Sequence, residues 1–219
     1  MNNQSKELAE LFLAGNEKQA LHTVQAYLQN HTKNELYQHI LTPAMYWIGE
    51  LWEKNIITVA DEHLATAICD YVVSVTEMRK GEQTPEQKKV MVLGPEGEDH
   101  YIGLKMVASL FKENGWEVRY LGPNLPLGAA IETANRWKPD AIALSAALVY
   151  RLPVLKKYTE AFRALDFKPS VILGGRAVAM ANWPASESEG VLIVKELDQL
   201  KNWIQTGKEP DNEFDISFG

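Results

Sequence analysis

The pattern of apolar residues changes near residue 80, and this change constrains the fold more than any other feature of the sequence. Before it, apolar side chains recur every three to four residues, which is typical of amphipathic helices. After it, short apolar runs alternate with amphipathic stretches, which is the pattern of a parallel sheet covered by helices on both faces. The sequence therefore predicts an all-α half followed by an α/β half.

Residues 1–80 are expected to form a four-helix bundle. Gly15-Asn16 separates the first two helices, and Thr32 is the expected N-cap of the third. The third helix should run from about residue 34 to 53 with a kink at Pro43, because proline removes a helical hydrogen bond. The fourth should run from about residue 59 to 79. Four helices joined by short connections predict an antiparallel bundle.

The α/β half is expected to span residues 90–206, with a polar linker at 81–89 and an acidic tail at 207–219. Its architecture should be a Rossmann-like (flavodoxin-like) five-stranded parallel sheet. The expected strands lie at residues 90–93, 118–121, 141–144, 171–173 and 191–194.

Composition excludes several classes of protein. In 219 residues, the single cysteine, Cys69, rules out an intrachain disulfide framework and a multi-cysteine metal site. No apolar run reaches the roughly 18 residues of a membrane span, and no secretory signal begins the chain. A net charge of −7 argues against direct binding of nucleic acid, which needs clustered Lys and Arg. We therefore expect a cytoplasmic protein that contacts neither membrane nor nucleic acid and could form a homo-oligomer.

The loop after the first expected strand carries ionisable side chains at a strand end, where doubly wound sheets bind ligands. It contains Glu98, Asp99 and His100 and lacks a phosphate-binding G-x-G-x-x-G spacing. A neutral His100 is a competent metal ligand, and a carboxylate two residues earlier could orient it. The alternative is that Glu98 or Asp99 caps the next helix and His100 is merely exposed.

Small residues follow the third and fourth expected strands. Ser145 and Ala147 lie at the end of the third, and Gly174-Gly175 lie at the end of the fourth. Small side chains at neighbouring strand ends would let an elongated ligand enter between them, although Gly175 alone could be an ordinary turn glycine.

The set Glu98-x-His100-x-x-Gly103, Ser145 and Gly174-Gly175 resembles the cobalamin-binding domain of methionine synthase and its relatives, over residues 89 to 205. The family pattern is D-x-H-x-x-G, S-x-L and G-G. Glu98 therefore stands where aspartate is usual, and Ala147 where leucine or threonine is usual. The resemblance implies that His100 is the lower axial ligand of cobalt. It also implies that the nucleotide tail of the corrinoid threads between the serine and the two glycines.

The helical half resembles the four-helix cap of light-responsive, adenosylcobalamin-binding regulators. Their pattern is a tryptophan, nine residues and then Glu-His, which occurs here as Trp52 and Glu62-His63, with Val59 between them. In that family these residues line the upper face of the corrin and enclose the adenosyl group. The resemblance implies cobalamin as cofactor, with adenosylcobalamin favoured and methylcobalamin as the other form. On the residues alone, Trp52 could be a core aromatic and Glu62-His63 a solvated pair.

Two departures bear on function. The residue after the tryptophan is histidine in the light-sensing repressors but Glu53 here, and a carboxylate is a poor ligand for low-spin cobalt. We therefore expect water as the upper occupant of any photoproduct, ahead of Glu53 or His63. The repressors also have a winged-helix DNA-binding domain, which we do not expect in this chain.

The resulting expectation is a cobalamin-binding sensor module, responsive to light or adenosylcobalamin, that acts through a regulatory protein partner. The alternative is a corrinoid carrier protein of a methyltransferase system, with a methyltransferase as partner. We expect no enzymatic activity of its own, because the sequence offers no nucleophile–base pair and Cys69 lies among apolar helix neighbours.

Overall fold

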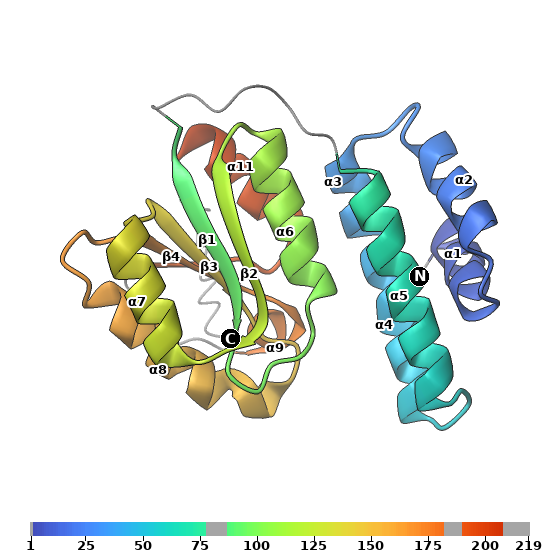
Figure 1. Cartoon of the computed structure of the whole chain (residues 1–219). Helices are drawn as coiled ribbons and strands as arrows, with labels where there is room; N and C mark the ends of the chain where they lie inside the picture. The colour runs from blue at the N-terminus through green and yellow to red at the C-terminus, as the bar shows by residue number, and fades with distance from the viewer. Residues whose placement is uncertain (1, 78–86, 182–189, 208–219) are drawn as a thin grey trace, which may run out of the picture.

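The computed structural model describes residues 2–77, 87–181 and 190–207. The expected linker at 81–89 lies outside the described residues up to 86, and so does the expected acidic tail from residue 208 on. Within the described part, the chain forms a helical layer followed by an α/β unit (Figure 1).

The helical layer is built from capped helices. Asn2, Asn16, Thr32 and Thr58 each accept a hydrogen bond from a backbone N–H of the helix that follows, which satisfies a donor that the helix cannot use. The helices are α1 (Asn3–Leu13), α2 (Glu17–Tyr27), α3 (Lys33–Leu36), α4 (Thr42–Glu53) and α5 (Val59–Val75).

The interruption expected at Pro43 takes the form of a π-helical turn, η1 (Tyr37–Leu41), between α3 and α4. Pro43 itself lies in the first turn of α4 and has no N–H to donate to His39 O, which accepts instead from Ser5 Oγ at 2.9 Å and from Asn2 Nδ2 at 3.2 Å. The third predicted helix is therefore one rod in three segments. Its hydrogen-bonding pattern changes from α-helical to π-helical in η1, which ends two residues before the proline.

Five parallel strands form one sheet in the order β2-β1-β3-β4-β5, so the predicted α/β class is confirmed. The strand order reverses beside β1, because β2 lies on one side of it and β3 on the other, and doubly wound sheets bind ligands at the carboxyl ends of such strands. The strands are β1 (Lys89–Pro95), β2 (Glu117–Leu125), β3 (Ala141–Ser145), β4 (Ser170–Gly174) and β5 (Val191–Ile193).

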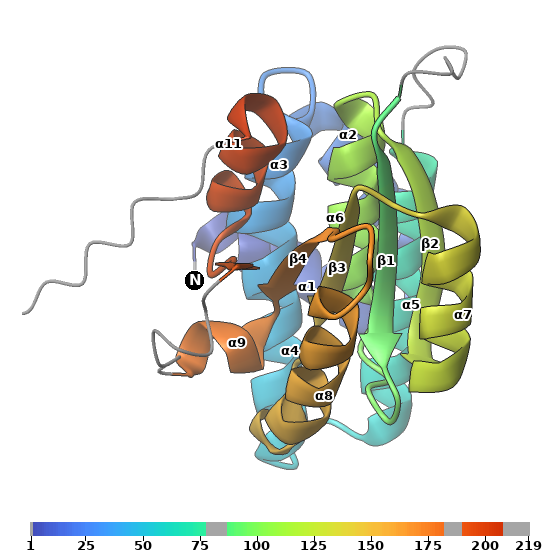
Figure 2. The same ribbon diagram turned by 90° about the vertical axis from the view of Figure 1, so that its left-hand side faces the viewer.

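Helices cover both faces of the sheet (Figures 1 and 2). The face opposite the helical layer is covered by α7 (Leu127–Trp137) and α8 (Leu152–Arg163), which enclose one apolar core with Met91, Ile142 and Leu173 of the sheet. The other face is covered by α6 (Ile102–Glu113) and α11 (Leu197–Thr206). A short 3-10 turn, η2 (Val149–Arg151), follows β3, and a short helix, α9 (Arg176–Met180), follows β4. The sequence did not predict α9.

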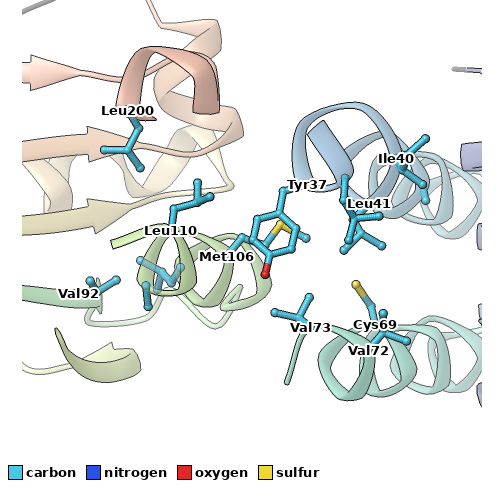
Figure 3. Close-up of a cluster of buried hydrophobic side chains, with 14 of the residues drawn as sticks. Tyr37, Ile40, Leu41, Cys69, Val72, Val73, Val92, Met106, Leu110 and Leu200 are labelled. Carbon is cyan, nitrogen blue, oxygen red and sulfur yellow. The ribbon is translucent and has the colours of Figure 1, made fainter. Parts of the chain in front are cut away.

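The helical layer and the sheet share a second core. Buried side chains of η1 and α5 pack against Met106 and Leu110 of α6, whose other side lies on the sheet (Figure 3). Tyr37 is fully buried there, and its hydroxyl donates to Ser109 Oγ of α6 at 3.0 Å. Cys69 is buried in the same core, and burial raises its pKa to about 12, which disfavours the reactive thiolate. Among the described residues, no helix is long and apolar enough to cross a membrane.

Candidate functional site

The loop between β1 and α6 holds a buried carboxylate against an exposed imidazole. The Glu98 side chain is 1% exposed, whereas the His100 side chain is 59% exposed. One oxygen of Glu98 accepts from His100 Nδ1 at 2.6 Å and from His100 N at 3.0 Å, and the other accepts from Ala147 N at 2.8 Å. An ionised carboxylate can only accept, so in the neutral imidazole the proton lies on Nδ1 and Nε2 keeps its lone pair.

The hydrogen bonds also decide the charges in this loop. Burial alone would raise the pKa of Glu98, but the bonds from His100 and from Ala147 N outweigh it and lower that pKa. The same bond to Glu98 raises the pKa of His100 against the effect of partial burial, and the charge of Glu62 on α5 acts in the same direction. Glu62 therefore lies close enough for the end of the helical layer to influence this loop.

The alternative in which Glu98 or Asp99 caps α6 is wrong. Tyr101 occupies the N-cap position of α6, and no side chain makes a capping hydrogen bond there. The Glu98 carboxylate is instead occupied by His100 and Ala147. Asp99 is exposed. Gly103, in the first turn of α6, has no heavy atom within 4 Å of the position that a Cβ would take, so its own surface is open.

The small residues after β3 and β4 meet at the same edge of the sheet. Ser145 pairs with Gly174 in the strand register, and Ala146 N donates to Gly174 O at 3.1 Å. Gly175 has a φ of 98°, and a Cβ there would lie 2.5 Å from both Ala146 O and Ser145 Oγ. Glycine is therefore required at this position by both its backbone conformation and the lack of space.

The predicted upper-face residues gather where α4 ends and α5 begins. Trp52 is 48% exposed and Val59 is 55% exposed, so neither belongs to the core. Glu62 accepts from Thr66 Oγ1 at 2.8 Å, and its other oxygen lies 3.0 Å from Nδ1 of His63, whose side chain is 74% exposed. Exposed aromatic and aliphatic side chains in such a turn are available to cover a ligand. Figure 2 shows this turn at the same end of the molecule as the end of β1.

A contact that the sequence did not reveal joins this end of the helical layer to the sheet. Arg176 comes directly after the two glycines. Its guanidinium nitrogen Nη1 lies 3.8 Å from a carboxylate oxygen of Glu53, and its Cζ lies 5.4 Å from the ring centre of Tyr46. Glu53 therefore has a cationic partner in the α/β unit. No local sequence signal could have found this contact, because the partners come from α4 and α9.

These residues fit a corrinoid. An imidazole with its Nδ1 held by a buried carboxylate is oriented to give Nε2 to a metal. The strand ends carry only small residues, and Gly175 packs closely against Ser145 Oγ and Ala146 O. Among the described residues, no group of three or more His, Cys, Asp or Glu could hold a metal ion by itself, and a corrinoid brings its own equatorial ligands. A separate cavity of about 380 Å³ lies among α1, α2 and α3, away from His100.

The comparisons with known families agree with this geometry. Residues 88–195 match a family model described as B12 binding domain, and residues 4–77 match a second family model with the same description.

Two curated relatives are corrinoid proteins. Trimethylamine corrinoid protein 2 of Methanosarcina acetivorans is 29% identical over 120 residues, which cover 52% of this chain and 54% of that protein. This match therefore spans about half the length of the relative. Dimethylamine corrinoid protein 1 of Methanosarcina mazei is 24% identical over 204 residues, which cover 88% of this chain and 94% of that protein.

A solved structure shows the same fold. The monomethylamine corrinoid protein of Methanosarcina barkeri superposes with a TM-score of 0.63 at 16% identity, covering 85% of this chain and 88% of that chain. The helical layer thus precedes the sheet in the same arrangement. The chain therefore carries both B12-binding domains, one after the other, and corrinoid proteins are among its homologues.

Proposed function

We propose that this chain is the corrinoid carrier protein of a methyltransferase system. The observation that carries the proposal is the match to a dimethylamine corrinoid protein along nearly the whole of both chains. It favours the carrier interpretation over the light-responsive sensor. Relatives named for trimethylamine and monomethylamine point the same way, so the partner would be a methyltransferase that acts on a small methylated compound.

The residues of the site have separable roles in this proposal. His100 Nε2 would hold the metal, and Glu98 would fix the imidazole and its tautomer. Ser145, Gly174 and Gly175 would border the nucleotide tail at the sheet edge. Ala147 would act through its backbone N–H, which fixes Glu98. A bound corrinoid supplies a cobalt ion that can take up and release a methyl group.

The end of the helical layer would cover the other face of the corrin. Trp52 and Val59 offer apolar area that excludes water, and Glu62 and His63 form a polar rim beside it. This role needs no adenosyl group, so methylcobalamin becomes the favoured form. Glu53 is paired with Arg176, which supports its assignment to contact between the halves rather than to the metal.

Loading the purified chain with hydroxocobalamin tests the lower-ligand role. We expect tight binding and a visible spectrum of imidazole-ligated cobalt, with His100→Ala weakening binding at least about tenfold and losing that spectrum. His22→Ala, an exposed histidine on α2, is the matched control and should change neither. A His100→Ala protein that binds with unchanged affinity and spectrum would disprove the assignment.

A comparison of upper ligands separates the carrier from the sensor. The carrier should bind methylcobalamin and adenosylcobalamin with affinities within about tenfold of each other. A sensor should prefer adenosylcobalamin by more than that and lose the preference in Trp52→Ala. The exposure of Trp52 is the structural observation that keeps the sensor as second candidate. Illumination that changes the oligomeric state of the adenosylcobalamin-loaded protein would decide for the sensor.

A further inference from the structure

We propose that Asn124, at the end of β2, is the residue that positions the Glu98–His100 pair. The inference deepens the proposed function, because it names what sets the geometry of the proposed metal ligand. Asn124 lies on a different strand from the loop and outside every sequence motif discussed above. It hydrogen-bonds to the backbone of this loop, so its role is to position the imidazole and the carboxylate.

Asn124 makes two hydrogen bonds to the two residues that determine where the Glu98 side chain starts. Its side-chain Oδ1 accepts from Gly97 N at 2.7 Å, and its backbone N–H donates to Glu98 O at 2.9 Å. The peptide groups on both sides of Gly97 and Glu98 are thereby tied to β2. A shift of this backbone would move the Glu98 carboxylate relative to His100.

The backbone of Asn124 explains why asparagine serves here. Its φ is 55°, in the left-handed region that asparagine tolerates better than most residues. In this conformation its N–H and its side-chain oxygen both reach the neighbouring loop. An alanine would lose the acceptor and also strain the backbone, so the two effects must be separated experimentally.

Other contacts hold the loop on either side of the bond from Gly97 N to Asn124. Gly97 has a φ of 80°, and the guanidinium of Arg151 lies where a Cβ of residue 97 would be. On the other side, Tyr158 OH accepts from Glu96 N at 3.0 Å and donates to Leu125 O, the residue after Asn124. Gly97 is thus packed between Arg151 and Asn124, and Asn124 supplies the directional bond.

A displacement of the Glu98 carboxylate would weaken its hydrogen bonds. Glu98 is buried, and each of its oxygens is already bonded, one of them across to Ala147 N on the β3 side. A hydrogen bond to a buried charge weakens steeply with poor geometry and leaves a costly unpaired group. Losing the Asn124 Oδ1 contact should therefore lengthen the 2.6 Å bond between Glu98 and His100 Nδ1.

The test compares Asn124→Gly, which keeps the left-handed backbone but removes the acceptor, with Asn124→Asp, which keeps an acceptor of the same shape. The first readout uses the protein without cofactor: the Nδ1 proton of His100, observed by proton NMR on histidine-labelled protein, at the low-field shift of a short charge-assisted bond. The second readout is hydroxocobalamin affinity and its visible spectrum. We expect Asn124→Gly to lose the low-field signal and to bind about tenfold more weakly, and Asn124→Asp to retain both.

Two further variants complete the design. Lys138→Gly places a glycine at another left-handed position, the C-cap of α7 with a φ of 50°, and should change neither readout, which controls for the effect of glycine on the unfolded chain. Asn114→Ala removes an asparagine that donates to Leu110 O at the end of α6 and should change neither readout. Thermal unfolding confirms that each variant is folded.

The outcomes distinguish this inference from the proposed function. An unchanged Nδ1 signal and unchanged affinity in Asn124→Gly would overturn the role of Asn124. If the unmutated protein binds no hydroxocobalamin, the proposed function fails, and the Nδ1 signal still decides whether Asn124 positions the pair. If Asn124→Asp behaves like Asn124→Gly, the carboxamide itself is needed and the role as a simple acceptor is wrong.

Discussion

At the scale of single residues, the burial of Glu98 decides how His100 can act. A carboxylate in water would hold an imidazole weakly, but here it is enclosed and bonded from three N–H groups. Its lowered pKa keeps it ionised, and the raised pKa of His100 keeps the imidazole protonated to a higher pH than usual. The same pair that orients His100 for a metal therefore also strengthens the competition from a proton.

The first prediction concerns this competition. Because the pKa of His100 is raised, Nε2 stays protonated to a higher pH than in an ordinary histidine, so corrinoid affinity should rise as pH increases through that raised pKa. Glu98→Gln removes the charge that causes the shift, and the midpoint of the affinity curve should move to lower pH. Titrations of hydroxocobalamin binding at a series of pH values measure both curves. Identical midpoints in the two proteins would contradict the assigned cause.

The second prediction concerns two glycines that differ in their surroundings. Gly175→Ala should destabilise the protein by about 1–3 kcal/mol, since it combines a left-handed φ with a Cβ in contact with Ala146 and Ser145. Gly103→Ala should not destabilise it, because a Cβ there meets open space at the start of a helix. If the corrin lies beside His100, however, Gly103→Ala should weaken its binding. Urea unfolding and cofactor titration of both variants test this contrast.

At the scale of elements, the sequence predicted the type and order of the helices and strands well, and its failures have local causes. Apolar runs bounded by turn residues located every strand, because buried parallel strands have no polar face. β1 and β2 extend beyond the predicted runs to Pro95 and Leu125, where pairing rather than hydrophobicity defines the strand. The helix α9 was missed because five residues are too few to show a helical period.

In the candidate site, too, the positions that follow from local patterns could be predicted and the long-range contacts could not. The positions of His100, Ser145 and Gly174-Gly175 near strand ends could be predicted, because apolar runs locate the strands; their role in a site stays a prediction. The contacts of Asn124 with the loop and of Arg176 with Glu53 were not found, since each joins elements far apart in the chain. Which side chain meets which across such a distance is a property of the packed structure.

The third prediction belongs to the contact between η1 and α6. Tyr37→Phe leaves the ring in place but removes the hydroxyl that donates to buried Ser109, and we expect a loss of about 1 kcal/mol in the free energy of unfolding. The double variant Tyr37→Phe with Ser109→Ala should lose less than the sum of the two single changes, because neither hydroxyl is then left alone. Chemical unfolding of the four proteins completes the cycle, and strict additivity would contradict a direct bond.

At the scale of the whole molecule, the two halves are joined unevenly. Near the start of α3 the contact is buried and includes the shared core around Tyr37 and Met106 (Figure 3). At the opposite end, where Trp52 is exposed, the contacts include Arg176 near the ring of Tyr46 and its partly exposed ion pair with Glu53, a type that contributes about 0–1 kcal/mol. The layer is therefore held firmly at one end and loosely at the end that adjoins His100.

The fourth prediction follows from the shared core. Since residues of η1, α5, α6 and the sheet enclose one apolar cluster, the chain should unfold in a single transition. Tryptophan fluorescence and far-ultraviolet circular dichroism, recorded against urea, should give coincident curves. Two separated transitions would show that the helical layer and the sheet are independent folding units.

The sharing of α6 between the two cores has a consequence for the ancestry of such chains. A module that buries its own surface can be inserted, duplicated or lost as a unit, but the outer face of α6 is apolar and is covered by the helical layer. Any gene rearrangement that replaced the first half would have to supply a complementary surface for Met106 and Leu110 or leave them in water. The two halves are thus expected to be inherited together. Substitutions on one side of their interface should be accompanied by complementary substitutions on the other side.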